Sequence, residues 1–148
     1  MSKDCKKGRS NCPTSMSLEI IGDTWSLIVV RGFIFEGKRD YSEFIDLIEG
    51  ISSNILIDRL KWLTINGIFT KHQHPTNKKK KYYEITNKGF DLIIVIMELA
   101  RWGWKYFPDT LGPPEVKELY LNNPKEFVKY WKKQVIRRSQ EYINEAEK

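Results

Sequence analysis

Residues 50–69 read GISSNILIDRLKWLTINGIF, and this stretch decides the fold of the chain. Gly50 interrupts any preceding helix, and Ser52 is a favourable N-cap residue, so a helix is predicted to begin there. Asn66-Gly67 is typical of a helix end. Between these signals, leucines spaced by four and then three residues give the helix a single apolar face. These leucines are Leu56, Leu60 and Leu63.

The opposite side of this helix carries small and polar side chains, with Ile57 at its edge. An exposed helix face of this kind can enter the major groove of DNA and hydrogen-bond to base edges. Ile51 and Leu56 have the spacing of a hydrophobic staple, which fixes the angle at which the chain enters the helix. The candidate DNA-contacting residues of this helix are Ser52, Ser53, Asn54, Ile57, Asp58, Arg59 and Lys61.

Downstream of this helix the periodicity changes to that of strands. IFTKHQH (68–74) and KYYEIT (81–86) are rich in β-branched and aromatic residues, and they flank the polar segment PTNKKK (75–80). The pattern predicts a β-hairpin with a basic tip. A lysine run at such a tip is suited to the phosphate backbone. The predicted phosphate-contacting residues are Lys78, Lys79, Lys80 and Lys81.

Upstream, SLEIIGDTWSLIVVRGFIFEG (17–37) predicts two amphipathic helices separated by Gly22-Asp23. Gly22 is expected to end the first helix in the left-handed conformation, and Asp23 is expected to be the N-cap of the second. Gly37 ends the second helix.

A third, short helix is predicted within DYSEFIDLIEG (40–50). Asp40 or Ser42 could cap it, and Asp40 with Glu43 has the spacing of a capping box. Its apolar side is predicted to contain Phe44, Leu47 and Ile48.

The segment NKGFDLIIVIMELARWGWKYF (87–107), preceded by Thr86, is apolar around most of a helix. One small domain cannot cover all of its sides, so a second copy of the chain is predicted to cover the rest. Trp102 and Trp104 are expected to fill the core of the dimer, or to line a small-ligand cavity between the subunits. The predicted dimerisation residues are Ile93, Ile96, Met97, Ala100 and Trp104.

Prolines at 108, 113 and 114 separate a C-terminal helical extension, residues 108–148, from the preceding domain. The extension is expected to pack on the dimer helix or on the partner subunit. The predicted organisation is a basic tail (1–11), a DNA-binding domain with its dimerisation helix (12–107, the helix about 87–107) and this extension. Its predicted apolar side comprises Phe127, Val128, Trp131 and Val135.

The net charge of +6 is unevenly distributed along the chain. Residues 71–90 carry six basic and one acidic side chain, whereas residues 15–70 carry five basic and eight acidic ones. A concentrated basic region suits a polyanionic partner. No apolar run reaches the roughly 18 residues that a membrane span needs, and no signal peptide is seen, so a cytoplasmic location without membrane contact is expected.

The order of these elements is that of a winged helix-turn-helix. The predicted fold class is mainly α with a small β-hairpin: a winged helix-turn-helix with a long dimerisation helix and a C-terminal helical extension. In this arrangement a helix reads base edges in the major groove while the basic hairpin contacts the phosphate backbone or the adjacent minor groove.

Residues 12–107 also resemble the HxlR-type family of winged-helix transcriptional regulators, relatives of the MarR group. The resemblance implies a homodimeric DNA-binding regulator that contacts two half-sites related by two-fold symmetry in double-stranded DNA. Two departures are visible: GDTW (22–25) stands where the family usually has GGKW, and the hairpin tip is rich in lysine where proline is common. The matching landmarks are Cys12-Pro13, Ile21-Gly22, Trp25, Lys38-Arg39, Tyr41-Ser42-Glu43, Gly50-Ile51-Ser52, Leu56, Leu60, Leu63, Gly67, Tyr83, Thr86 and Gly89.

The family resemblance further implies that a thiol at the position of Cys12 can sense oxidants or electrophiles. Nearby basic residues such as Arg9 would favour its thiolate, and Cys5 is a candidate resolving partner. A small-molecule effector is the other regulatory option. Cys5 and Cys12 with His72 and His74 do not follow a zinc-ligand spacing, so neither a metal nor a cofactor is predicted.

An enzymatic function is not predicted, because the sequence has no nucleophile–base pairing and no glycine-rich phosphate loop. One alternative to DNA binding stays open. The excess of acidic residues in 15–70 would also suit a winged-helix protein-interaction module that does not bind DNA.

Overall fold

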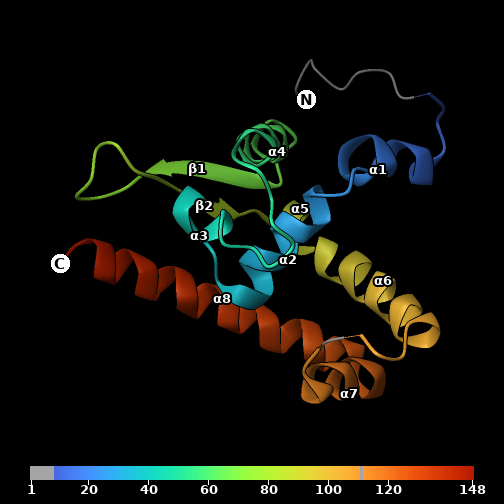
Figure 1. Cartoon of the computed structure of the whole chain (residues 1–148). Coiled ribbons are helices and arrows are strands. Elements are labelled where there is room, and N and C mark those ends of the chain that lie inside the picture. The colour runs from blue at the N-terminus through green and yellow to red at the C-terminus, as the bar shows by residue number, and fades with distance from the viewer. Residues whose placement is uncertain (1–8, 111) are drawn as a thin grey trace.

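The computed structural model of the chain describes residues 9–110 and 112–148. It consists of helices and a two-stranded antiparallel hairpin at one side of the molecule (Figure 1), in the order predicted for a winged helix-turn-helix. The elements are α1 (Pro13–Ile21), α2 (Ser26–Glu36), α3 (Tyr41–Phe44), α4 (Ser53–Ile65), β1 (Phe69–Gln73), β2 (Lys81–Ile85), α5 (Asn87–Phe90), α6 (Leu92–Tyr106), α7 (Pro114–Asn122) and α8 (Pro124–Ala146).

Helix α4 follows the sequence prediction closely. Its three leucines are buried in the core, and Ile51 is buried in the same core cluster, in agreement with the predicted staple spacing. Ser52 occupies the N-cap position, although its side chain forms no capping hydrogen bond. The helix ends at Asn66, and Gly67 adopts a φ of 71° that favours glycine. The buried leucines hold the opposite face of α4 toward solvent.

The hairpin is fixed to the rest of the domain on two sides. Phe69 and Tyr83 pack against Phe33 of α2 and Phe44 of α3, with ring centroids 5.3 to 6.5 Å apart. At the outer edge of β2, the backbone N–H of Tyr83 donates to the carbonyl of Arg39 over 2.8 Å. The aromatic cluster and this backbone bond position the base of the hairpin relative to α3 and α4.

Two details at the start of α2 differ from the prediction. Gly22 has a φ of −78°, so it is right-handed and not left-handed. Glycine is needed there for space, since a Cβ would lie 2.4 Å from the carbonyl oxygen of Leu18. The N-cap position belongs to Trp25, yet Asp23 still caps this end, because its Oδ1 accepts hydrogen bonds from the backbone N–H groups of Trp25 and Ser26 at 2.9 Å.

Helix α3 is capped as predicted, with Asp40 and Glu43 forming a capping box. Phe44 and Leu47 are buried, but Ile48 is 82% exposed, so its assignment to the apolar side was wrong. The helix is only one turn long, and the chain beyond Phe44 leaves the helical path before Ile48 could turn inward.

The single apolar helix predicted for 87–107 is divided at Asp91 into α5 and α6. Thr86 caps α5 by accepting a hydrogen bond from the backbone N–H of Gly89. The inward side of α6 carries Ile93, Ile96 and Met97, which are buried in the core of the same chain. These three predicted dimerisation residues are thus covered by α2 and its neighbours in the same chain. Ala100 and Trp104 are half-buried.

Helix α8 packs on α2 of its own chain. The sequence analysis predicted that it packs on the dimer helix or on a partner subunit. Phe127 and Val135 are buried in the core, and Arg138 donates to the carbonyls of Ile34 and Phe35 over 3.2 and 3.0 Å. Figure 1 shows α8 running from α7 back beneath the hairpin loop. Among the described residues, no helix has the length and apolar character required to cross a bilayer.

Candidate nucleic-acid interface

The exposed face of α4 is the first part of the candidate interface. The residues predicted to contact bases all lie on the surface. They include the apolar residue Ile57, which is 56% exposed. An apolar side chain flanked by small polar ones can contact both a thymine methyl group and hydrogen-bonding base edges. The exposed residues of this face are Ser52, Ser53, Asn54, Ile57, Asp58 and Lys61.

Arg59 is held at the flank of this face. Its guanidinium pairs with Asp58 at 2.5 Å and with Asp23 at 3.2 Å, and it lies 5.8 Å from the ring of Trp62. The hydrogen bond to Asp58 is the main cause that raises the pKa of Arg59 above its usual value. Arg59 thus offsets the negative charge of Asp58, which would otherwise repel a phosphate backbone.

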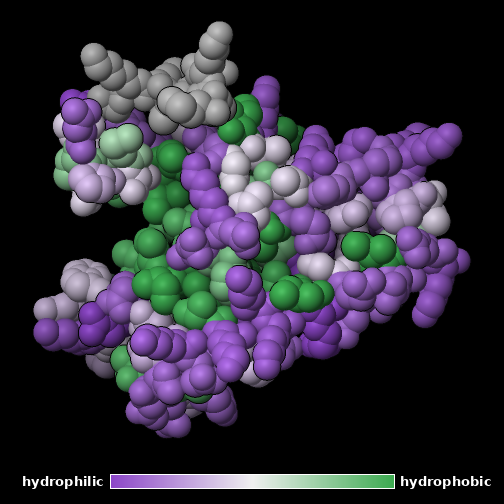
Figure 2. Space-filling view, turned by 180° about the vertical axis from the view of Figure 1, so that it is seen from behind, coloured by the Kyte–Doolittle hydropathy of each residue, from purple (hydrophilic) through white to green (hydrophobic). Residues whose placement is uncertain are grey.

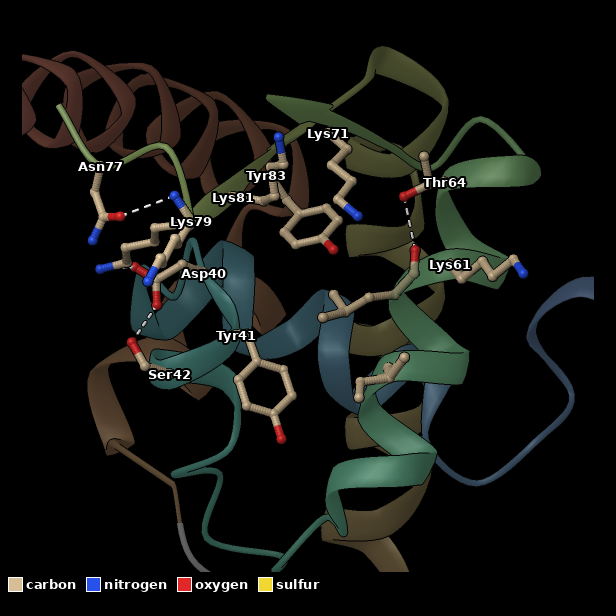
Figure 3. A pocket seen from close by; sticks show the side chains of 13 residues that line it. Asp40, Tyr41, Ser42, Lys61, Thr64, Lys71, Asn77, Lys79, Lys81 and Tyr83 are labelled. Carbon is tan, nitrogen blue, oxygen red and sulfur yellow. Dashed lines mark hydrogen bonds and ion pairs between the residues drawn. The ribbon is translucent and has the colours of Figure 1, made fainter. Parts of the chain in front are cut away.

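A groove of about 750 Å³ separates α4 from the hairpin. In Figure 3, Lys71 and Tyr83 extend from the hairpin into this groove, while Lys61 on α4 points away from it. The floor of the groove is partly apolar and its rim is basic, as expected of a surface that fits against a sugar–phosphate strand. It is lined by Asp40, Tyr41, Ser42, Ile57, Leu60, Lys61, Thr64, Lys71, Asn77, Lys79, Lys80, Lys81 and Tyr83.

Lys80 has a different environment from the other lysines of the hairpin. Its Nζ lies 2.8 Å from Oδ2 of Asp40, a carboxylate whose side chain is 1% exposed. This contact turns Lys80 toward the protein, so Lys80 is a poor candidate for a phosphate contact. Lys78 and Lys79 are exposed in the loop, and Lys81 is exposed at the start of β2, where its Nζ donates to Oε1 of Gln73.

The hairpin loop is ordered by its own polar groups. Nδ1 of His74 accepts from the backbone N–H groups of Thr76 and Asn77 at 3.3 and 3.2 Å. The side-chain oxygen of Asn77 accepts from the backbone of Lys79 at 3.0 Å. A loop held in this way loses less conformational freedom when it binds a partner.

Sequence reasoning missed Lys71, the lysine of β1 that faces the groove. A signal for it was present: Lys71 lies two residues after the buried Phe69, so strand alternation places both on the same side of the hairpin. Its cross-strand partner is Tyr83, which also lines the groove.

Cys12 occupies the N-cap position of α1, with Pro13 following it, and its thiol is free and exposed. The backbone N–H groups of Ser15, and then Thr14, lower the pKa of the thiol. Of the nearby basic residues predicted to favour the thiolate, Arg9 pairs with Glu19 at 3.2 Å, and those before residue 9 lie outside the described residues. The helix N-terminus therefore favours the thiolate. Cys5 lies outside the described residues.

The outward side of α6 forms a second, apolar surface. Figure 2 shows apolar side chains gathered in a hollow over α6, between α1 and α7. Trp102 is 59% exposed and packs on Tyr106 and Phe107, with ring centroids 5.1 and 5.7 Å away. We call this the α6 outer face; it consists of Ile94, Val95, Leu99, Trp102, Tyr106 and Phe107.

The two histidines serve the hairpin. Nε2 of His72 lies 2.7 Å from the hydroxyl of Thr70, while His74 orders the loop. Across residues 9–110 and 112–148, no group of three or more His, Cys, Asp or Glu side chains is placed to hold a metal ion.

Comparison with known proteins matches residues 20–110 to the model of the HxlR-like helix-turn-helix family. An HTH-type transcriptional regulator of Mycobacterium tuberculosis is 32% identical over 98 residues, which cover 66% of this chain and 61% of that protein. The structure also resembles that of the protein PA1607, with a TM-score of 0.63, 32% identity and coverage of 71% and 73% of the two chains. The reduced form of the redox regulator HypR matches with a TM-score of 0.51, 26% identity and coverage of 64% and 92%.

Proposed function

The chain belongs to the HxlR-like helix-turn-helix family, and on that basis we propose that it is a homodimeric, sequence-specific regulator of transcription that binds double-stranded DNA. The observation that carries the proposal is the groove between α4 and the hairpin, with an exposed polar helix face on one side and basic side chains on the other. The two surfaces correspond to the two tasks of a DNA-binding protein, which are reading bases and holding phosphates.

In the proposed complex, α4 enters the major groove. Ser53, Asn54 and Ile57 face the base edges there. The hairpin follows the adjacent backbone, where Lys71, Lys78, Lys79 and Lys81 meet phosphates. Asn54 can form a bidentate hydrogen bond with adenine, which makes it the main candidate for discrimination between bases.

The α6 outer face is the proposed dimer contact. Five large apolar side chains on the outward side of α6, together with Phe107 at its C-cap, form a patch that a monomer would leave in water. In a dimer with two-fold symmetry, the same residues of the second copy cover this patch. Such a dimer presents two copies of α4. It would bind two half-sites whose centres are separated by one turn of the DNA double helix, about 10 base pairs, or by a multiple of that distance.

A mobility-shift experiment with a pool of fragments from the source genome tests this proposal. We expect a subset of fragments to be retained at low salt and in the presence of competitor DNA. If no fragment is retained, the result would favour the alternative, which is a protein-interaction module that does not bind DNA. The structure weakens that alternative, because several acidic groups are paired internally, including Glu49 with Arg31 at 2.5 Å and Asp40 with Lys80 at 2.8 Å.

The proposal includes no catalytic step, and it places the protein in the cytoplasm with access to DNA. It also includes a regulatory thiol, Cys12, which is supported by the exposure of the sulfur and by the backbone N–H groups that lower its pKa. The redox regulator HypR among the structural relatives is consistent with this role.

Treatment with the thiol oxidant diamide is expected to weaken DNA binding by the wild type about tenfold or more and to leave Cys12→Ser unaffected. Because the pKa of Cys12 is lowered, its alkylation by iodoacetamide should reach half of its maximal rate at a lower pH than the alkylation of free cysteine does. Mobility shifts with and without diamide measure the first effect, and mass spectrometry at a series of pH values measures the second. Release of both proteins by diamide would exclude sensing through Cys12.

A further inference from the structure

The C-terminal part of α8 returns to the hairpin and contacts it at several points. The hydroxyl of Ser139 donates to Oε2 of Glu84 on β2 at 2.6 Å. Further along, the hydroxyl of Thr76 in the hairpin loop donates to the carbonyl of Ala146 at 2.8 Å. Figure 1 shows this end of α8 beneath the loop. Residues more than 50 positions apart in sequence are thereby joined.

Tyr142 is the centre of this contact. Its ring packs on Tyr82 of β2 and on His74 of the loop, with centroids 5.3 and 6.1 Å away. Its hydroxyl donates to Oδ2 of Asp40 over 2.9 Å. Burial, followed by the hydrogen bond to Asp40, raises the pKa of Tyr142, so the hydroxyl stays protonated and remains a donor.

Asp40 joins α8 to the hairpin loop, because the same carboxylate accepts from Tyr142 and pairs with Lys80 at 2.8 Å. Its other oxygen accepts from Ser42 at 2.5 Å and from the backbone of Glu43. Burial alone would raise the pKa of Asp40, but the hydrogen bonds from Lys80, Ser42 and Tyr142 outweigh burial and lower it. A buried carboxylate that keeps its charge depends on each of these partners.

We propose that α8 holds the hairpin in its orientation relative to α4, and that it thereby sets the affinity for DNA. Ser139 and Tyr142 are the positioning residues of this α8–hairpin contact. An isolated two-stranded hairpin is marginally stable and mobile in water, so a support on its outer side determines how often its lysines face the phosphate backbone. The inference rests on the proposed function. The family match ends at residue 110, so this support belongs to the part of the chain beyond it.

The positioning role is separable from the contribution of α8 to the core. Phe127 and Val135, which are buried, lie in the first and middle turns of α8, whereas Ser139 and Tyr142 lie toward its C-terminal end and are half-buried. Removal of the Tyr142 hydroxyl should therefore affect the hairpin more than the overall fold. Tyr130 offers a matched control, since it is an exposed tyrosine near the start of the same helix.

Tyr142→Phe in the full chain tests the proposal. Without DNA, amide hydrogen exchange in residues 74–81 is expected to accelerate about fivefold, because the variant cannot form the hydrogen bond to the charged Asp40. With DNA, the Kd is expected to rise about fivefold and the salt dependence to flatten, while the thermal midpoint stays close to that of the wild type. Tyr130→Phe should change none of these quantities. Ser139→Ala should act in the same direction as Tyr142→Phe, and the double variant should exceed either single one.

Unchanged exchange in residues 74–81 of both Tyr142→Phe and the double variant would overturn the proposal. Faster exchange with an unchanged Kd would overturn the claim that α8 sets DNA affinity. Both results differ from a failure of the proposed function. If the proposed function is wrong, the wild type itself binds no DNA, whereas the exchange experiment is done without DNA.

Discussion

Replacement of Lys71, Lys78, Lys79 and Lys81 by alanine is expected to weaken DNA binding about 100-fold at about 0.1 M salt, and to do so for every duplex sequence. Each lysine that meets a phosphate releases a condensed counterion. The slope of log K against log salt concentration should therefore flatten by about 0.9 for each phosphate that is no longer neutralised, or by about 3.6 if each of the four lysines neutralises one. A salt titration of the binding constant measures both effects.

Helix α8 provides a control of equal charge. Lys125, Lys129, Lys132 and Lys133 are also exposed, and their replacement by alanine lowers the net charge by the same amount. This control variant should keep the salt slope of the wild type. Equal losses of affinity in the two variants would mean that net charge, and not the hairpin, accounts for the affinity. An unchanged slope in the hairpin variant would contradict the assignment of the hairpin to phosphate binding.

Leu99→Glu combined with Trp102→Glu is expected to convert the proposed dimer to monomers, with a rise in the dimer Kd of at least about 1,000-fold. Each side chain contributes twice by symmetry, and burial of a large apolar side chain is worth about 1.5–3 kcal/mol. Both residues are exposed in the single chain, so the monomer should stay folded. Sedimentation equilibrium measures the mass, and circular dichroism checks the fold. Affinity for a two-half-site duplex should fall together with dimerisation.

Ile136→Glu is the matched control for the dimer variant. Ile136 is 62% exposed, close to the 59% of Trp102, but it lies on α8. The control variant should remain a dimer. A dimer that survives both substitutions on the α6 outer face would show that another surface joins the subunits.

The parts of the fold that were predicted correctly from the sequence are those with local signals. Helix α4 is defined by Gly50, Ser52 and Asn66-Gly67, with a leucine pattern that repeats every three or four residues between them. The hairpin is defined by two β-rich segments around a lysine-rich loop. In both elements the signals lie within about 20 residues of one another, so they can be read without knowledge of tertiary contacts.

The features of the candidate site that could not be predicted from the sequence depend on contacts between distant residues. Nothing near Lys80 in the sequence indicates that Asp40 would pair with it, and Asp40 meets Tyr142 across 102 positions. Helix α6 raised a related problem. Because it is apolar on nearly all sides, its pattern could not distinguish the side that faces α2 from the side that faces outward. Of the predicted dimer residues, Ile93, Ile96 and Met97 lie on the side that is buried in the core of the same chain.

Footprinting of a retained genomic fragment with the wild type and with Asn54→Ala tests the central claim, that α4 and the hairpin of a symmetric dimer bind duplex DNA. We predict two protected regions related by two-fold symmetry, with centres about 10 base pairs or a multiple apart. We also predict that Asn54→Ala weakens protection of that fragment by about tenfold, or about 1.4 kcal/mol, which lies within the roughly 1–3 kcal/mol of one bidentate base contact. A single unsymmetric protected region, or equal protection by the two proteins, would contradict the account.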